Sequence, residues 1–190
     1  SDQDVFTQLF QAPEGGNWQV KDGRYVGANS ADLANLSIAP AYILELGASL
    51  QTGAQGGFVF DYYGPQDFKF VTISVKTGQV LIGHSTARDG WVVNAAWNNS
   101  GLSETTDYSL GVTLIGNTVS VTFNDQGVLS YAFNALVTDG RFGLLANGGE
   151  ASFDRFRVRT DDPAFIGSTP ALPTLSISDA SVAEGDRGTQ

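Results

Sequence analysis

The chain has 190 residues, a length that suits one substantial domain with an appendage. Its 20 Asp and Glu against 10 Lys and Arg give a formal net charge of −10, which disfavours nucleic acids and anionic membranes as partners. The lack of Cys excludes disulfides and thiolate metal sites, and no stretch is long and apolar enough for a transmembrane helix.

Short runs rich in Val, Ile, Phe and Tyr recur along the chain, separated by Gly, Asn or Asp, as is typical of β-strands. Alternation is clearest in 107–124, where Leu110, Val112 and Val121 fall on one face and Ser and Thr fall on the other. The runs predict about twelve strands: 17–20, 23–27, 42–50, 57–63, 68–76, 79–84, 90–95, 107–115, 118–124, 127–133, 141–147 and 150–159.

Turn residues separate several of these runs at hairpin spacing. Asp22-Gly23, 76–79, 115–118 and 124–127 each place Gly, Asn or Asp where a tight turn needs a positive φ. A single sheet of so many strands would leave one face wet and its edges open. We therefore expect an all-β fold in which two antiparallel sheets form a sandwich or barrel.

The character of the sequence changes after Arg159. Residues 160–173 hold three of the six prolines and show no strand alternation, which is typical of an extended linker. We expect a sandwich over 1–160, a Pro-rich linker over 161–174 and the start of another domain over 175–190.

Two segments carry a resemblance to a known fold. Residues 16–25, with Trp18, and residues 139–158, with Phe153, have the order and spacing of the first and last strands of a concanavalin A-like lectin/glucanase jelly roll of the laminin-G-like branch. Residues 58–70 and 83–92 resemble modules of giant bacterial surface adhesins. The resemblance implies a two-sheet antiparallel jelly-roll sandwich. Lectins, hydrolases and spacers all use such folds, so function must be argued from sites.

The C-terminal segment 175–189 resembles the opening strand of a Calx-beta domain, a Ca²⁺-binding sandwich often found in extracellular arrays. This resemblance implies a module of a larger secreted or bacterial surface protein. If residues 175–190 are ordered, we expect them to pair with an exposed sheet edge.

A catalytic function is not expected. A retaining glycosidase needs two carboxyl groups about 5–5.5 Å apart, and the glucanase pattern E-x-D-x-x-E is not found in the sequence. Asp61 and Asp67 are separated by a Gly-Pro turn. His84 is the only His in the chain, and its neighbour Ser85 would point to the opposite side of a strand.

Polar and aromatic side chains concentrate between residues 61 and 97, which suits sugar recognition because rings stack on aromatic faces while charged and amide groups bind hydroxyls. Two alternatives stay open: either Tyr62 or Tyr63 packs in the core, and Trp91 can be a core anchor. Trp97 is expected in a loop. Lys69 and Arg88 could hold a ligand carboxylate or pair with neighbouring Asp side chains. The predicted ligand-binding residues are Tyr63, Asp67, Lys69, His84, Arg88, Trp91 and Trp97.

The resemblance also implies a structural Ca²⁺ where the first and last strands meet. Its ligands would be Asp154, an N-terminal acid, Asp4, and backbone carbonyls near Gly16 or Asn17. Alternatively, Asp154 pairs with a neighbouring Arg.

Together these observations predict a non-catalytic ligand-binding module of a large bacterial adhesin, with carbohydrate as the ligand class. The alternative is a spacer or a peptide- or protein-binding sandwich, and a glycoside hydrolase is the least favoured. The expected partners are a carbohydrate or another cell-surface ligand and the neighbouring domains, without nucleic acid and without membrane insertion.

Overall fold

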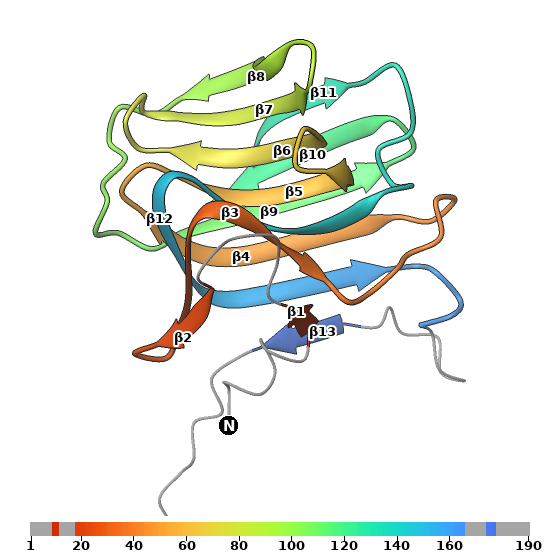
Figure 1. Ribbon diagram of the computed structural model, residues 1–190, viewed down its shortest axis with the longest axis horizontal. Helices are drawn as coiled ribbons and strands as arrows, with labels where there is room; N and C mark the ends of the chain where they lie inside the picture. Colours follow the sequence, from red (N-terminus) through yellow and green to blue (C-terminus); the bar gives the residue numbers. More distant parts are fainter. Residues whose placement is uncertain (1–8, 12–17, 166–173, 178–190) are drawn as a thin grey trace, which may run out of the picture.

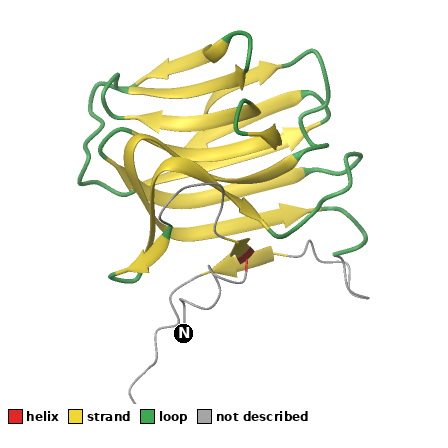
Figure 2. Ribbon diagram, in the orientation of Figure 1, coloured by secondary structure: helices red, strands yellow, loops and turns green. Residues whose placement is uncertain are grey.

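The computed structural model describes residues 9–11, 18–165 and 174–177, and it confirms the expected all-β class (Figure 2). Within these ranges no helix has the length and apolarity needed to cross a membrane. The strands are β1 (Phe10–Gln11), β2 (Gln19–Lys21), β3 (Arg24–Ala34), β4 (Leu44–Thr52), β5 (Gln55–Gly64), β6 (Asp67–Ser74), β7 (Gln79–Thr86), β8 (Gly90–Asn98), β9 (Tyr108–Ile115), β10 (Thr118–Phe123), β11 (Gln126–Ala132), β12 (Arg141–Thr160) and β13 (Thr174–Ile177).

The strands pair antiparallel in the order β11-β10-β9-β4-β12-β5-β6-β7-β8. β3 also pairs with β12, β1 and β2 pair with β3, and β13 pairs with β12. In Figure 1, β8 lies at the top of the molecule and β13 at the bottom. The four predicted hairpin turns form where expected, with positive φ at Asp22, Gly78, Gly116 and Asn124.

β12 joins the two layers of the sandwich. Its first part, Arg141–Asn147, pairs with β5, and its second part, Ala151–Thr160, pairs with β4. The strand bends between these parts, where Gly148 has a φ of 71°, and β3 bends beside it at Asn29, with a φ of 51°. The second half of β3 therefore belongs to the layer of β5–β8 and the first half to the layer of β4, β9, β10 and β11.

The main core lies between the two layers. The sequence alternates so that Leu46, Leu110 and Val121 face inward from one layer and Phe58 and Ile82 from the other, all almost fully buried. The apolar alternation of the predicted strands is thus matched by the inward faces of both layers.

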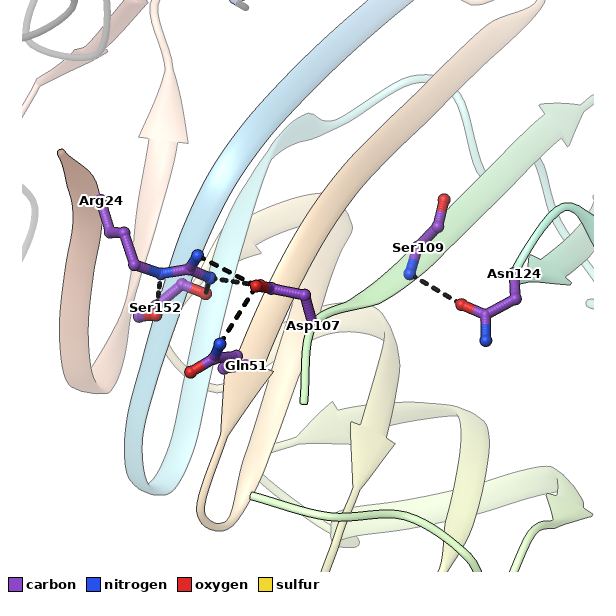
Figure 3. A network of polar contacts seen from close by, with 6 residues as sticks. All are labelled: Arg24, Gln51, Asp107, Ser109, Asn124 and Ser152. Carbon is purple, nitrogen blue, oxygen red and sulfur yellow. Dashed lines mark hydrogen bonds and ion pairs between the residues drawn. The ribbon is translucent and has the colours of Figure 1, made fainter. Parts of the chain in front are cut away.

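A polar network ties the first strands to the last at one end of the sandwich (Figure 3). The Arg24 guanidinium donates to Asp107 Oδ1 at 2.6 Å and to Ser152 Oγ at 2.7 Å, and Gln51 Nε2 donates to Asp107 at 3.1 Å. The four residues come from β3, the segment before β9, β12 and β4. The network therefore connects segments that are far apart in the sequence.

The segment after β12 stays attached to the sandwich. Asp162 is buried, and its carboxylate accepts hydrogen bonds from the backbone N–H of Ala39 and Ala164, while Asp161 accepts one from Ile43. Phe165 packs against the core. Residues 161–165, at the start of the predicted linker, are therefore fastened to the domain. β13 pairs with residues 156–159 of β12, in agreement with the expected edge pairing, while residues 178–190 lie outside the described ranges.

Candidate ligand-binding groove

The outer face of the β5–β8 layer carries a second apolar cluster. Outward faces of sandwich strands are usually polar, yet Val59 and Phe70 on this face are both 0 % exposed. The cluster consists of Leu33, Val59, Tyr62, Phe68, Phe70, Leu81 and Leu145, with Ala31 and Trp91 packed against it. Because the main core lies on the other side of these strands, this cluster does not contribute to the packing between the two layers.

A β-bulge at Asp61 places Tyr62 in this second cluster. Asp61 adopts a left-handed conformation with a φ of 46°, and the pairing of β5 with β6 shifts register between Phe60 and Gly64. Phe60 belongs to the main core and Tyr62 to the outer cluster. The alternative that regular alternation left open is thus decided: Tyr62 packs, but on the outer face of the sheet and apart from Phe58 and Phe60.

Gly83 allows two aromatic rings to stack on the sheet. A Cβ at this position would overlap the Phe70 ring and the backbone of Val92. The Phe70 ring therefore lies against the glycine, and the Trp91 indole stacks on it with a centroid separation of 3.6 Å and an interplanar angle of 15°. The half-buried indole is held on its inner side by Phe70 and reaches the surface of the layer.

A groove of about 690 Å³ lies on this face, and several residues of the outer cluster, Trp91 among them, line it. Its wall combines aromatic rings with amide and hydroxyl groups and one charged side chain, Arg141. The lining residues are Asn29, Ser30, Ala31, Leu33, Tyr62, Pro65, Phe68, Ser85, Trp91, Arg141, Leu145, Ala146 and Asn147. The mixture of apolar faces and hydrogen-bonding groups is the chemistry of a small-molecule or sugar site.

One row of lining residues runs across the strands. Arg141 of β12 is paired in register with Tyr62 of β5, whose ring stacks on Phe68 of β6 at a centroid distance of 5.5 Å. Phe68 is in register with Ser85 of β7, and Ser85 with Trp91 of β8. The row thus begins at a guanidinium and ends at an indole, four strands apart.

Among the predicted ligand-binding residues, the groove contains Trp91 alone. Tyr63 is 60 % exposed, Asp67 is exposed, and neither lines the groove. His84 lies on the inner side of β7, where Nδ1 is 2.6 Å from Asn94 Oδ1 and the ring meets Phe133 edge-on.

The predicted carboxylate site between Lys69 and Arg88 does not assemble. Lys69 forms an ion pair with buried Asp61 and lies over the Phe133 ring. Arg88 is 93 % exposed, with its Nε 3.7 Å from Asp89 Oδ1. Each cation therefore has an acidic partner, although Lys69 pairs with Asp61 and with neither of the two expected Asp residues.

Trp97 was expected in a loop, and this expectation is wrong. β8 continues to Asn98, and Trp97 is paired with Val80 on the inner side of the strand. Its half-buried ring lies 5.4 Å from that of Phe123 and packs against the main core. The residues that follow Trp97 are polar, which is typical of a loop, and the sequence therefore gave no indication that the strand includes Trp97.

The sequence reasoning missed Arg141, Tyr62, Phe68 and the two amides Asn29 and Asn147. The burial pattern of β12 gave no signal for the two residues on this strand, because residues 142–146 are all buried, on both faces of the strand, between exposed Arg141 and half-buried Asn147. Which of the two faces was the outer one depends on the pairing of β12 with β5, and that is a long-range property.

Asp61 and Asp139 are two neighbouring acidic residues whose carboxyl groups affect each other's pKa. Burial and then Asp139 raise the pKa of Asp61, while Lys69 opposes this, and the hydrogen bond to Asp61 lowers the pKa of Asp139. Hydrolysis of a glycosidic bond requires two carboxyl groups that face the bound sugar. Neither Asp61 nor Asp139 lines the groove, and the described lining includes no carboxylate at all.

The predicted calcium ligands are only partly described. Asp154 lies half-exposed on β12, and the described residues contain no group of three or more His, Cys, Asp or Glu that could hold a metal. Asp4, Gly16 and Asn17 lie outside the described ranges. The structure therefore does not test the site, and calcium stays a prediction.

Comparison with known protein families and with curated proteins gives no match. Solved structures do match. A carbohydrate binding module, CBM66, from Bacillus subtilis has a TM-score of 0.62 at 15% identity, covering 73% of this chain and 88% of that chain. The GH43 protein BlXynB from Bacillus licheniformis has a TM-score of 0.56 at 13% identity, covering 74% and 34%.

A putative glycosyl hydrolase from Parabacteroides distasonis gives a TM-score of 0.53 at 12% identity, covering 75% of this chain and 89% of that chain. At such identities the likeness concerns the fold alone. The chain is thus a two-layer antiparallel jelly-roll sandwich, in agreement with the expected fold class.

Proposed function

We propose that this protein is a non-catalytic carbohydrate-binding module that holds a saccharide in the groove on the β5–β8 layer. The observation that carries the proposal is the row from Tyr62 to Trp91, in which aromatic rings form the floor and Ser85 lies between them in register. The apolar C–H face of a sugar stacks on aromatic rings, and its hydroxyls need neutral hydrogen-bonding groups such as Asn29 and Asn147.

A binding function is favoured over hydrolysis by the composition of the groove wall. Hydrolysis of a glycosidic bond uses a carboxylic acid and a second carboxylate on either side of that bond. The wall supplies amides, hydroxyls and one guanidinium instead. The similarity of the fold to a carbohydrate binding module supports the same choice, while the similarity to glycosyl hydrolases makes an activity assay a necessary part of the test.

We further propose that the module belongs to a secreted or surface-anchored bacterial adhesin. This rests on the resemblance of residues 58–70 and 83–92 to adhesin modules and of residues 175–189 to a Calx-beta strand. In that setting the ligand would be a cell-surface carbohydrate, and neighbouring domains would place the groove at a distance from the cell.

The test is a glycan-array screen followed by calorimetry on the wild-type chain and two variants. Trp91→Ala removes the indole from the groove, and Tyr63→Ala removes an aromatic side chain that is exposed outside it. We expect Trp91→Ala to weaken binding at least tenfold, since one stacked ring contributes about 1–3 kcal/mol. Tyr63→Ala should bind as the wild type does.

A blank array, or equal binding by Trp91→Ala and the wild type, would contradict the proposal and favour a spacer or a peptide-binding sandwich. Release of reducing sugar from the glycan that binds would contradict its non-catalytic part.

A further inference from the structure

Arg141 is the one charged residue among the described residues that line the groove, and it has no acidic partner. Its side chain is exposed, and within the described ranges no hydrogen bond or ion pair involves it. The basic side chains of Arg24, Lys69 and Arg88 are each paired with an Asp. An unpaired guanidinium is therefore found at the place where the wall is otherwise neutral.

Asp139, two residues before Arg141, is occupied elsewhere. The Asp61 carboxyl group, the Tyr63 hydroxyl and Lys69 all act on its carboxylate and lower its pKa. Asp61 and Lys69 lie on the inner side of their strands, while Arg141 lines the groove on the outer side. The backbone between them is tightly packed, because a Cβ at Gly140 would overlap the backbone of Asp61 and Tyr62. The nearby acid therefore does not neutralise the groove.

The net negative charge of the protein opposes the binding of an anionic ligand at this position. With a net charge of −10, the surface as a whole repels anions. At physiological ionic strength this repulsion is screened over about 8 Å, so direct partners decide whether an anion binds. A guanidinium presents a planar fork of donors that holds a carboxylate or a sulfate through two parallel hydrogen bonds.

We infer that the groove takes a saccharide that carries a single anionic group, a carboxylate or a sulfate ester, and that Arg141 binds this group. The inference rests on the proposed function, because it places the sugar rings on the row from Tyr62 to Trp91. One guanidinium balances one negative charge. A neutral sugar would leave the guanidinium without a partner, and a densely charged polymer would bring more negative charge than the guanidinium balances.

The position of Arg141 also sets the direction of the ligand. Arg141 is on β12 and Trp91 on β8, and the strands between them are β5, β6 and β7. Four strand spacings amount to about 19 Å. The anionic group at one end and the indole at the other therefore define a site for several sugar units, with the charged unit next to Tyr62.

The test compares a neutral oligosaccharide that carries one terminal uronic acid with its methyl ester, which lacks the negative charge, and adds a monosulfated oligosaccharide with its desulfated form. Calorimetry is performed on the wild type, Arg141→Gln, Trp91→Ala and, as the matched control, Arg88→Gln. Arg88 is also an exposed Arg but lies outside the groove.

We expect the wild type to bind one anionic ligand at least tenfold more tightly than its neutral form, and to lose affinity as NaCl rises. Arg141→Gln should remove this preference and leave weak binding of the neutral form, while Arg88→Gln should keep it. The two ligand pairs show whether the anion is a carboxylate or a sulfate.

If neutral and anionic forms bind equally, or if Arg141→Gln keeps the preference, the inference is overturned while the proposed function stands. If none of these ligands binds but the array shows a neutral glycan that depends on Trp91, the inference alone fails. If no glycan binds at all, both fail.

Discussion

Phe60 and Tyr62 are two residues apart in β5, yet Phe60 lies in the core between the layers and Tyr62 lies on the outer face. In a regular strand such residues share a face. Asp61, with its φ of 46°, provides the extra residue that reverses the alternation. The groove therefore depends on a single backbone conformation.

The first prediction concerns Asp61. Val tolerates a positive φ poorly, whereas Asn adopts it readily. Asp61→Val should lower the free energy of unfolding by about 3 kcal/mol, because it strains the bulge and leaves Lys69 without its buried partner. Asp61→Asn removes the charge but keeps the conformation, so it should be less destabilised and should retain glycan binding. Urea unfolding and calorimetry measure both effects, and loss of binding in Asp61→Asn would show that the bulge is not what positions Tyr62.

A second prediction concerns Gly83, which accommodates the rings of Phe70 and Trp91. Gly83→Ala introduces a Cβ that overlaps Phe70 and the Val92 backbone, so we expect a loss of about 1–3 kcal/mol in stability. The displaced indole should also weaken glycan binding at least tenfold. Gly127→Ala is the matched control, because no atom lies within 4 Å of its added Cβ. Unchanged binding in Gly83→Ala would argue against the stacked pair as the ligand platform.

A third prediction concerns the pH dependence of stability. Asp32 is fully buried, accepts a hydrogen bond from the Tyr25 hydroxyl, and has no hydrogen-bond partner at Oδ1 within the described chain. Burial raises the pKa of Asp32 to about 6 from 3.8, with the hydrogen bonds from Tyr25 and the Leu33 backbone opposing it. The folded state therefore holds this proton more tightly than the unfolded state does.

The sign follows from proton linkage. Below pH 3.8 both states are protonated at Asp32, and between this pH and about 6 the unfolded state has lost the proton while the folded state keeps it. Stability should thus fall as pH rises through this window, by about 3 kcal/mol in total. Asp32→Asn should lack this fall, while Asp67→Asn, at an exposed position, should keep it. Urea unfolding at pH 4, 5, 6 and 7 measures the difference between wild type and variants, and parallel curves for wild type and Asp32→Asn would contradict the prediction.

The strands and turns were predictable because their signals are local. Val119 and Val121 alternate with Ser120 and Thr122, and Gly116 and Asn124 occur where hairpins need them. Sequence alone also identified the concentration of aromatic residues around Trp91. These features depend on neighbours within a few residues.

The faces of the sheet were not predictable in the same way. The bulge at Asp61 reverses the alternation, so Tyr62 packs on the outer face and apart from Phe60. β8 extends through Trp97, which packs against the main core where a loop was expected. Arg141 becomes part of the groove only because β12 lies beside β5. Such pairings join residues about 80 positions apart, and no local pattern encodes them.

Calcium provides a fourth prediction. If Asp154 is a ligand as the jelly-roll resemblance implies, Ca²⁺ should raise the melting temperature of the wild type relative to EDTA. A concentration one hundred times the Kd would add about 2.7 kcal/mol. Asp154→Asn should abolish the shift, and Asp125→Asn, an exposed Asp in the β10–β11 turn, should keep it. Equal melting temperatures with Ca²⁺ and EDTA would contradict the predicted site.

The last prediction concerns the ion pair of Arg24 and Asp107. The Asp107 side chain is 42% exposed and that of Arg24 is 22% exposed, so solvent screening limits the pair to about 0.5–1 kcal/mol. A double-mutant cycle with Arg24→Met and Asp107→Asn should return a coupling free energy of this size. Arg24→Met should cost more than Asp107→Asn, because Arg24 also donates to Ser152 Oγ and to the Ser152 carbonyl oxygen. Glycan affinity should stay unchanged in both variants, since neither residue lines the groove. A coupling near zero would mean that the first and last strands are held together by the packing of Trp18 against Tyr25 and Phe153 instead.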